Sequence, residues 1–293
     1  MFDELVFISM RGLGLGAILA LTAISLNVIY QATHILNFAQ GGMLVLGGLI
    51  GVYFSAGGYG SPIWFLGMGV AGVAMAALMM VQGAITLWPL SHSTEQQSWL
   101  ITTLSVSIII SALLLLTLGP WSAEFKSRVP SFQMMGMFTP IPYLVLPVVA
   151  LAWFVALRLF FRKSLQGLAL SALSQDLDAA AAAGLRVRRL QIAAFAVSGL
   201  VVGTAGYAAA PIISISPDAG IRYVISGFVV AVIGGMGNMT GAVICGPVVG
   251  IVAMIATYRL GGQYEGFVSL IILTLILLLR PSGLFGTHTA RRF

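Results

Sequence analysis

The feature that most constrains this sequence is a long stretch without formal charge. From Gly12 to Thr94 there is no Lys, Arg, Asp or Glu, which is room for several membrane-crossing helices at roughly 20 residues each. The whole chain agrees, since 59% of its residues are hydrophobic and only 8% are charged, against roughly 25% charged in soluble domains. Water is therefore not its main solvent, and the sequence predicts an integral membrane protein with many spans.

Nine apolar segments follow one another along the chain, separated by polar residues, prolines or glycines. They are 12–30, 41–56, 62–87, 99–118, 141–161, 190–210, 223–236, 240–258 and 266–279. Each is expected to be helical, because backbone groups in hydrocarbon must be hydrogen-bonded and no alternating barrel strands recur. We therefore predict an all-α polytopic transmembrane helix bundle, with one domain over 1–293. It has nine spans, or eight if 41–56 crosses only in part.

Two short segments, 41–56 and 223–236, predict discontinuous or re-entrant helices. At about 1.5 Å per residue, neither reaches across the roughly 30 Å of hydrocarbon. Polar Gly-rich turns adjoin them at 37–42 and 234–241, and paired interrupted helices in two halves of a chain point to a central binding path. The alternative is that small residues only allow close helix packing. We prefer that interpretation for Gly47, Gly48, Gly199, Gly203, Gly246 and Gly250.

Basic residues beside the span ends predict the orientation. The loop 162–189 is rich in Arg, and Arg280, Arg291 and Arg292 follow the last span. Cytoplasmic loops carry an excess of Lys and Arg, and an even number of crossings separates the two basic clusters. Both clusters therefore predict a cytoplasmic C-terminus in a multi-pass protein of a bacterial-type inner (plasma) membrane. The net charge of +6 is explained by this topology and does not indicate nucleic-acid binding.

The loop 162–189 is too polar to span a membrane, and its pattern predicts a short helix. Ser174 can cap such a helix, and Asp176 and Asp178 then fall in the first turn, where the helix dipole favours anions. The following alanines have high helix propensity, and Gly184 suits the position just past the helix end. We therefore expect a docking element here.

The same loop also has apolar residues near helical spacing. These are Leu165, Leu168, Leu173 and Leu177, and the return to the membrane is marked by Arg186, Arg188 and Arg189. An apolar stripe of this kind lies on lipid headgroups or enters the groove of a partner protein. The residues by themselves leave both interpretations open.

Residue sets for catalysis, metal binding or ATP hydrolysis are not found. The three histidines, His34, His92 and His288, have no Cys, Asp or Glu at metal-ligand spacing. A P-loop needs Gly before Lys-Ser/Thr, whereas Lys126 and Lys163 follow Phe and Arg. No carboxylate falls well inside a predicted span, which disfavours proton-driven transport. We expect no enzymatic activity, no cofactor and no metal, with any ATP hydrolysis on a separate subunit.

Four amide side chains are candidates for lining a substrate path, namely Asn27, Asn37, Gln40 and Asn238. Unpaired amides are costly in hydrocarbon, so such residues are expected at cavities or helix interfaces. The alternative for each is a structural hydrogen bond between helices.

Four strings carry a resemblance to a known family. They are Leu36 to Gly41 (LNFAQG), Ser174 to Arg189, Ile233 to Gly237 (IGGMG) and Arg280 to Gly286 (RPSGLFG). In this order, from about residue 9 to 286, the chain resembles the branched-chain amino acid ABC importer permeases of the LIV-H type. The resemblance implies a second homologous permease, cytoplasmic ATPase subunits and an extracytoplasmic substrate-binding protein as partners. It also implies that 174–189 is the segment coupled to an ATPase, and that transport follows alternating access.

The chain departs from this family at two places. Gly42 stands where members commonly have Glu, and Ala179 to Ala183 stand where relatives place charged or larger residues. The resemblance favours branched-chain amino acids as substrates, and urea or short amides are the alternative. A passive channel for small neutral solutes is the competing class, to be distinguished by ATP dependence. A structural subunit would carry no flux at all.

Overall fold

The computed structural model of this chain describes residues 2–90, 98–134 and 137–286. Within these residues, six helices are long and apolar enough to cross a membrane. They are α1 (Phe2–Thr33), α3 (Pro62–Leu90), α4 (Ser98–Leu118), α5 (Pro142–Lys163), α8 (Val187–Ala209) and α10 (Met239–Leu260). Three apolar helices are shorter, namely α2 (Gln40–Tyr53), α9 (Ala219–Gly234) and α11 (Glu265–Leu279). Each predicted apolar segment overlaps one of these helices, so the predicted bundle is confirmed.

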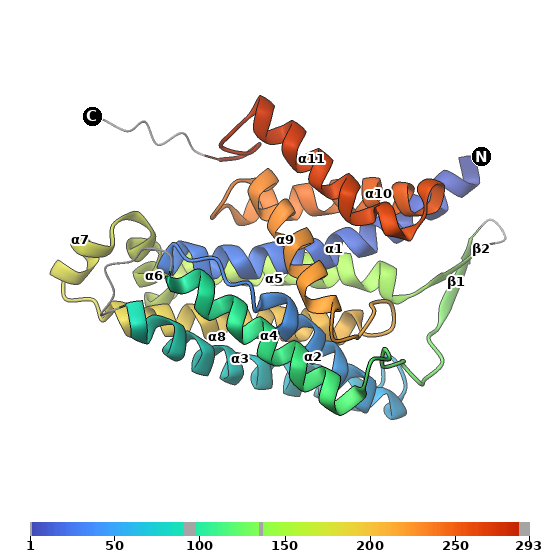
Figure 1. Ribbon diagram of the computed structural model, residues 1–293, viewed down its shortest axis with the longest axis horizontal. Helices are drawn as coiled ribbons and strands as arrows, with labels where there is room; N and C mark the ends of the chain where they lie inside the picture. The colour runs from blue at the N-terminus through green and yellow to red at the C-terminus, as the bar shows by residue number, and fades with distance from the viewer. Residues whose placement is uncertain (1, 91–97, 135–136, 287–293) are drawn as a thin grey trace.

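The remaining elements lie at the two ends of the bundle. Figure 1 shows α6 (Leu165–Gln175) and α7 (Leu177–Ala182) at one end. The hairpin of β1 (Ser131–Met134) and β2 (Met137–Pro140) lies at the other, as does the N-terminus. Short 3-10 turns, Phe54–Gly57 and Gly262–Tyr264, follow α2 and α10. The hairpin was not predicted, because strands of four residues are too short to show alternation.

The first helix starts earlier than its apolar run. The segment 12–30 was expected, whereas α1 begins at Phe2 and continues through Arg11 without a break. The Arg11 guanidinium lies over the Phe7 ring at 4.3 Å and donates a 3.2 Å hydrogen bond to the Phe138 carbonyl of β2. A charged side chain with such partners does not end a helix, so hydropathy alone places this boundary too late.

The helices form an interior and a periphery. In α1, 89% of the most apolar window is buried, compared with 22% in α4 and 17% in α5. Burial therefore makes α1 the central helix. The side chains that α4 and α5 expose are largely apolar, as expected for surfaces that face lipid or another apolar chain.

Small residues bring the interior helices together, as predicted for six glycines. A Cβ on Gly250 of α10 would lie 2.3 Å from the Gly16 Cα of α1, and one on Gly47 of α2 would lie 2.6 Å from the Gly203 carbonyl oxygen of α8. Both distances are far below van der Waals contact. Close backbone approach through small residues is a common way for helices to associate in membranes, so the packing interpretation is confirmed at these positions.

The two short interior helices begin against each other. The non-helical stretch 34–39 connects α1 to α2, and Figure 1 places α2 in the half of the bundle toward the hairpin, with α9 lying obliquely across it. A Cβ on Gly41 would lie 1.8 Å from the Gly220 carbonyl oxygen at the start of α9. The first turns of α2 and α9 thus touch through backbone alone.

Candidate translocation path and coupling segment

The stretch before α2 is held by a reciprocal pair of amides. Gln82 of α3 donates to the Asn37 Oδ1 at 2.6 Å, and the Asn37 Nδ2 donates to the Gln82 Oε1 at 3.2 Å. The Asn37 Oδ1 also accepts from the Ala39 N–H at 3.1 Å. Both side chains are buried. This pair fixes the non-helical stretch to α3, and Gln82 was missed because one amide in an apolar run gives no spacing signal.

The start of α2 is joined to α8 and α1. The Gln40 Nε2 donates to the Ser198 Oγ at 2.7 Å, and that hydroxyl donates to the Ser25 carbonyl oxygen at 2.8 Å. All three residues are fully buried. The Gln40 Oε1 is also buried, and it has no hydrogen-bond partner among the described residues. An unpaired buried acceptor costs about 1–3 kcal/mol, so this oxygen can accept from a ligand at little further cost.

Side chains of α1 hydrogen-bond to the backbone of the turn between α9 and α10. The Asn27 Oδ1 accepts from the Gly237 N–H at 3.0 Å, and its Nδ2 donates to the Asn238 carbonyl oxygen at 3.2 Å. Gln31, one turn later, donates to the Gly237 carbonyl oxygen. The structure therefore brings Asn27 and Asn238 together, whereas Asn37 and Gln40 belong to the start of α2.

Asn238 itself caps a helix and holds the end of the described chain. Its Oδ1 accepts from the Gly241 N–H at 3.1 Å in the first turn of α10, as an N-cap does. Its Nδ2 donates to the Phe285 carbonyl oxygen at 2.9 Å, within the RPSGLFG string. All four predicted path residues thus make hydrogen bonds between elements. This is the structural role that was named from the sequence as the alternative to lining a path.

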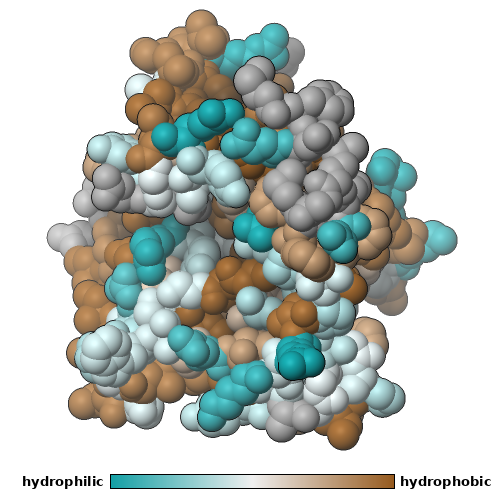
Figure 2. Space-filling model, turned by 90° about the vertical axis from the view of Figure 1, so that its right-hand side faces the viewer, coloured by the Kyte–Doolittle hydropathy of each residue, from teal (hydrophilic) through white to brown (hydrophobic). Residues whose placement is uncertain are grey.

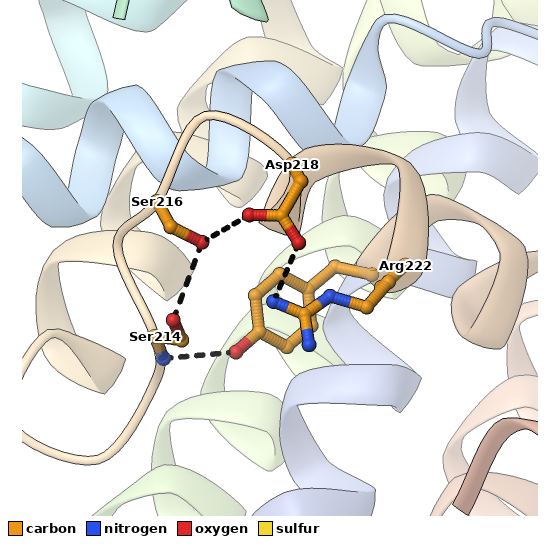
Figure 3. Close-up of polar contacts among 5 residues, drawn as sticks. Ser214, Ser216, Asp218 and Arg222 are labelled. Atoms are coloured by element: carbon orange, nitrogen blue, oxygen red, sulfur yellow. Dashed lines mark hydrogen bonds and ion pairs between the residues drawn. The ribbon is translucent and has the colours of Figure 1, made fainter. Parts of the chain in front are cut away.

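A charged cluster lies at the start of α9 (Figure 3). The Ser216 hydroxyl donates to the Asp218 Oδ1 at 2.7 Å, and the Arg222 Nη2 lies 3.2 Å from the Asp218 Oδ2. The pKa of the Asp218 carboxyl is lowered, chiefly by the Ser216 hydrogen bond and then by the Arg222 charge. Ser214 contacts Ser216 at 3.3 Å and donates from its backbone to the Tyr223 hydroxyl at 3.1 Å. The sequence signal that could have found it is the acid–base pair four residues apart.

Figure 2 views the hairpin end of the molecule. Hydrophilic and intermediate residues cover much of that face, and hydrophobic residues lie mostly along its edges with a smaller group near its centre. This distribution suits a bundle whose sides are in hydrocarbon and whose end is in water.

The segment beyond α5 contains two helices where one was predicted. Ser174 was expected to be the cap, but it lies inside α6, and its hydroxyl donates to the Ser171 carbonyl oxygen at 2.7 Å. Asp176 is the cap, because its Oδ1 accepts from the Asp178 and Ala179 N–H groups at 2.9 Å each. The prediction for Ser174 was therefore wrong, since a carboxylate two residues later satisfies two N–H groups.

The end of α7 was predicted correctly. Gly184 has φ +84°, which favours glycine, and its N–H donates to the Ala181 carbonyl oxygen at 3.0 Å. The Leu185 N–H donates to the Ala180 carbonyl oxygen at 3.1 Å, which completes a Schellman motif. Beyond it, Arg186, Arg188 and Arg189 are exposed at the start of α8.

The predicted leucine stripe does not form a single face. Leu165 and Leu168 are 87% and 50% exposed, whereas Leu173 is fully buried. Leu168 and Leu173 both belong to α6, where at 3.6 residues per turn they lie about 140° apart around the helix. Leu177 lies beyond the break at Asp176 and belongs to α7. The exposed leucines remain available to a partner or to lipid.

A cavity of about 490 Å³ lies at this same end of the bundle. It is open to the surface and is lined by residues of α5, α6, the start of α10 and the RPSGLFG string, with Gln31 and Asn238 among them. Among the described residues, no group of three His, Cys, Asp or Glu side chains is placed to hold a metal ion. His92, His288, Arg291 and Arg292 lie outside the described residues.

This arrangement of apolar spans, two short interior helices in contact and a helical pair beyond the bundle defines a polytopic membrane transport subunit. The chain belongs to the family described as branched-chain amino acid transport system / permease component, whose sequence model matches residues 8–277. It is thus a multi-pass membrane permease and not an enzyme.

Curated relatives extend over most of this chain. It is 26% identical to the high-affinity branched-chain amino acid transport system permease protein LivH of Escherichia coli (strain K12), over 94% of each chain. It is 28% identical to the probable branched-chain amino acid transport permease protein LivH of Methanocaldococcus jannaschii, over 92% of this chain and 89% of that one. The permease protein BraD of Pseudomonas aeruginosa is 25% identical, over 94% of each. No solved structure matches the chain.

Proposed function

We propose that this chain is a permease subunit of an ABC importer for branched-chain amino acids, forming half of the path. The observation that carries the proposal is the family match over 8–277, and the polar interior supports it. Among the described residues, every buried polar side chain is a neutral amide or hydroxyl. Such an interior suits a substrate without net charge, and it lacks the buried carboxylates that mark proton-coupled transport.

The path is proposed to pass the junction of α2 and α9. Short helices that meet inside a bundle present their first-turn N–H groups to a polar ligand. Gln40, beside that junction, supplies the buried Oε1 without a partner, which can accept from the ammonium group of an amino acid. Asn37, Asn27 and Asn238 are proposed to shape this path from the elements that they hold in place.

The end that holds α6 and α7 is proposed to face the cytoplasm. Arg158, Arg162 and Lys163 end α5, and Arg186, Arg188 and Arg189 begin α8, in agreement with the excess of basic residues in cytoplasmic loops. This orientation places the C-terminus inside and the N-terminus outside. It also leaves the exposed α7, with its Asp176 cap, as the coupling segment for an ATPase subunit.

The remaining partners of the proposed importer are separate chains. A second, homologous permease completes the path, and an extracytoplasmic binding protein delivers the substrate. The apolar surfaces of α4 and α5 suit contact with that permease or with lipid. Single-domain organisation over 1–293 is part of the same proposal.

The test is uptake in proteoliposomes that hold this chain with its partner permease, ATPase subunits and binding protein. Leucine uptake that requires both ATP and the binding protein is expected, with urea not accumulated. Urea uptake under the same conditions would replace the substrate class. Flux through this chain without ATP would identify a channel and contradict the proposal.

The coupling role has its own matched test. Asp176→Ala removes the cap of α7, whereas Asp178→Ala removes the same charge from an exposed residue that caps nothing. We expect Asp176→Ala to lower ATP-driven uptake about tenfold while thermal stability of the purified chain changes little, because loss of a cap costs about 1 kcal/mol. Equal uptake by the two variants would contradict the assignment of α7.

A further inference from the structure

The cavity beside α6 has a chemical character that substrate transport does not explain. Arg158 and Arg162 of α5 line one wall, Ser171 and Ser174 of α6 line a second, and Thr240 at the start of α10 lines a third. No Asp or Glu is among its lining residues. The cavity is therefore basic and rich in hydroxyl groups, whereas the buried interior of the bundle is neutral.

The two arginines repel each other, and none of the described residues forms an ion pair with either of them. They are four residues apart on α5, where like charges destabilise a helix. Neither Arg158 nor Arg162 is in an ion pair with a described residue, in contrast to Arg222 and Arg259. An anion between the two guanidinium groups would relieve this repulsion and can be bound by charge-assisted hydrogen bonds.

Apolar side chains line the same cavity. Phe154 and Phe161 belong to α5, and Met236, Met239 and Phe285 come from the α9–α10 turn and the RPSGLFG string. Aromatic and other apolar side chains do not stabilise a free inorganic anion. A phospholipid, in contrast, has an anionic headgroup joined to an apolar body and can contact both kinds of side chain. Basic pockets between membrane helices at the cytoplasmic side bind anionic headgroups.

We propose that this cavity binds the headgroup of an anionic phospholipid from the cytoplasmic leaflet, with its phosphate between Arg158 and Arg162. The inference rests on the proposed orientation of the chain. Because α5, α6 and α10 all line the cavity, the lipid would join the coupling end of the protein to the start of α10. Lipid bound there would limit how α6 moves relative to the bundle.

The test measures lipid retention by the purified full-length chain, with native mass spectrometry after delipidation and addition of phosphatidylglycerol or phosphatidylcholine. Arg158→Gln with Arg162→Gln is the test variant. Lys163→Gln is the matched control, because this exposed neighbour on α5 does not line the cavity. We expect affinity for phosphatidylglycerol to fall roughly fivefold for each arginine removed. Lys163→Gln and the wild type should retain it equally.

Three outcomes would overturn the inference. Equal retention by the double variant and Lys163→Gln would remove the arginines from any lipid site. Binding of inorganic phosphate that displaces phosphatidylglycerol at equal concentration would make this a free-anion site. Crosslinking of Arg162 to an acidic residue of an ATPase subunit would assign the cavity to that partner. Because retention is measured without transport, its failure is distinguishable from failure of the proposed import activity.

Discussion

The two short interior helices, α2 and α9, begin against each other, yet the polar side chains at their first turns have different surroundings. At α2, Gln40, Gly41 and Gly42 are all buried, and the polar partners are neutral. At α9, the Asp218 and Arg222 side chains are 72% and 61% exposed, and the partners are charged. Burial of an ionised side chain is far costlier than burial of a paired amide. Neutral amides and hydroxyls therefore occur at the buried start of α2, and charged side chains occur at the start of α9, where they reach water.

The largest expected effect on stability comes from breaking the junction itself. Gly41→Ala would place a Cβ 1.8 Å from the Gly220 carbonyl oxygen, so α2 and α9 would have to separate. We expect a loss of about 3 kcal/mol or more, since overpacking of backbone against backbone is not relieved by rotamer changes. Thermal unfolding in detergent, followed by size-exclusion chromatography, measures it.

A glycine in an open environment is the control for that substitution. A Cβ on Gly69 of α3 would meet nothing within 4 Å, so Gly69→Ala is expected to leave stability unchanged or to raise it by up to about 1 kcal/mol. If Gly41→Ala unfolds at the same temperature as Gly69→Ala, the close contact between α2 and α9 is wrong.

The next largest effect is expected at the far end of α9. Asn27→Leu removes both hydrogen bonds to the 237–238 turn and leaves the Gly237 N–H and Asn238 carbonyl without this partner. We expect a loss of about 2 kcal/mol, because each unsatisfied group costs about 1–3 kcal/mol when buried and less where water reaches it. The midpoint of thermal unfolding is the measurement. An unchanged midpoint would mean that the turn is held by Asn238 and Gln31 alone.

A third substitution separates function from stability on the α2 side. Gln40→Met keeps the side-chain length and removes both the unpaired Oε1 acceptor and the Nε2 donor to Ser198. Because the Ser198 hydroxyl keeps its own hydrogen bond to the Ser25 carbonyl oxygen, stability should fall by only about 1 kcal/mol. Uptake in proteoliposomes is expected to fall at least about tenfold if the Oε1 contacts the substrate. Full uptake by a stable Gln40→Met would leave Gln40 as a structural residue only.

The smallest effect is expected at the exposed charged pair. Asp218→Asn should cost at most about 1 kcal/mol, since an exposed ion pair contributes little. The sign of its pH dependence follows from the lowered pKa of Asp218. Its contribution is fully present above the ordinary carboxyl value of 3.8 and is lost only as the pH falls through the lower folded value. Wild type and Asp218→Asn should thus differ by a constant amount from pH 5 to 8, and a difference that vanishes at pH 5 would contradict this assignment.

The predictions made from sequence succeeded or failed for identifiable reasons. Position-specific backbone rules worked, since Gly184 ends α7 with positive φ. The prediction of the N-cap failed, because Ser and Asp are both good N-cap residues. Only the structure shows that α6 continues past Ser174 and that α7 starts after Asp176. The hydrogen-bond partner of Asn37 could not be predicted, because Gln82 lies 45 residues away in the sequence, on another helix.

What the sequence by itself determined is the solvent of this protein and the places of its apolar helices along the chain. Both follow from local hydropathy, because each helix satisfies its own backbone in hydrocarbon whatever its neighbours are. Only the tertiary structure decided that α1 is central, that α2 and α9 meet at Gly41 and Gly220, and that Asp218 stays exposed where Gln40 is buried. These depend on which faces of distant helices come into contact, and the periodicity of one segment carries no information about the surface of another.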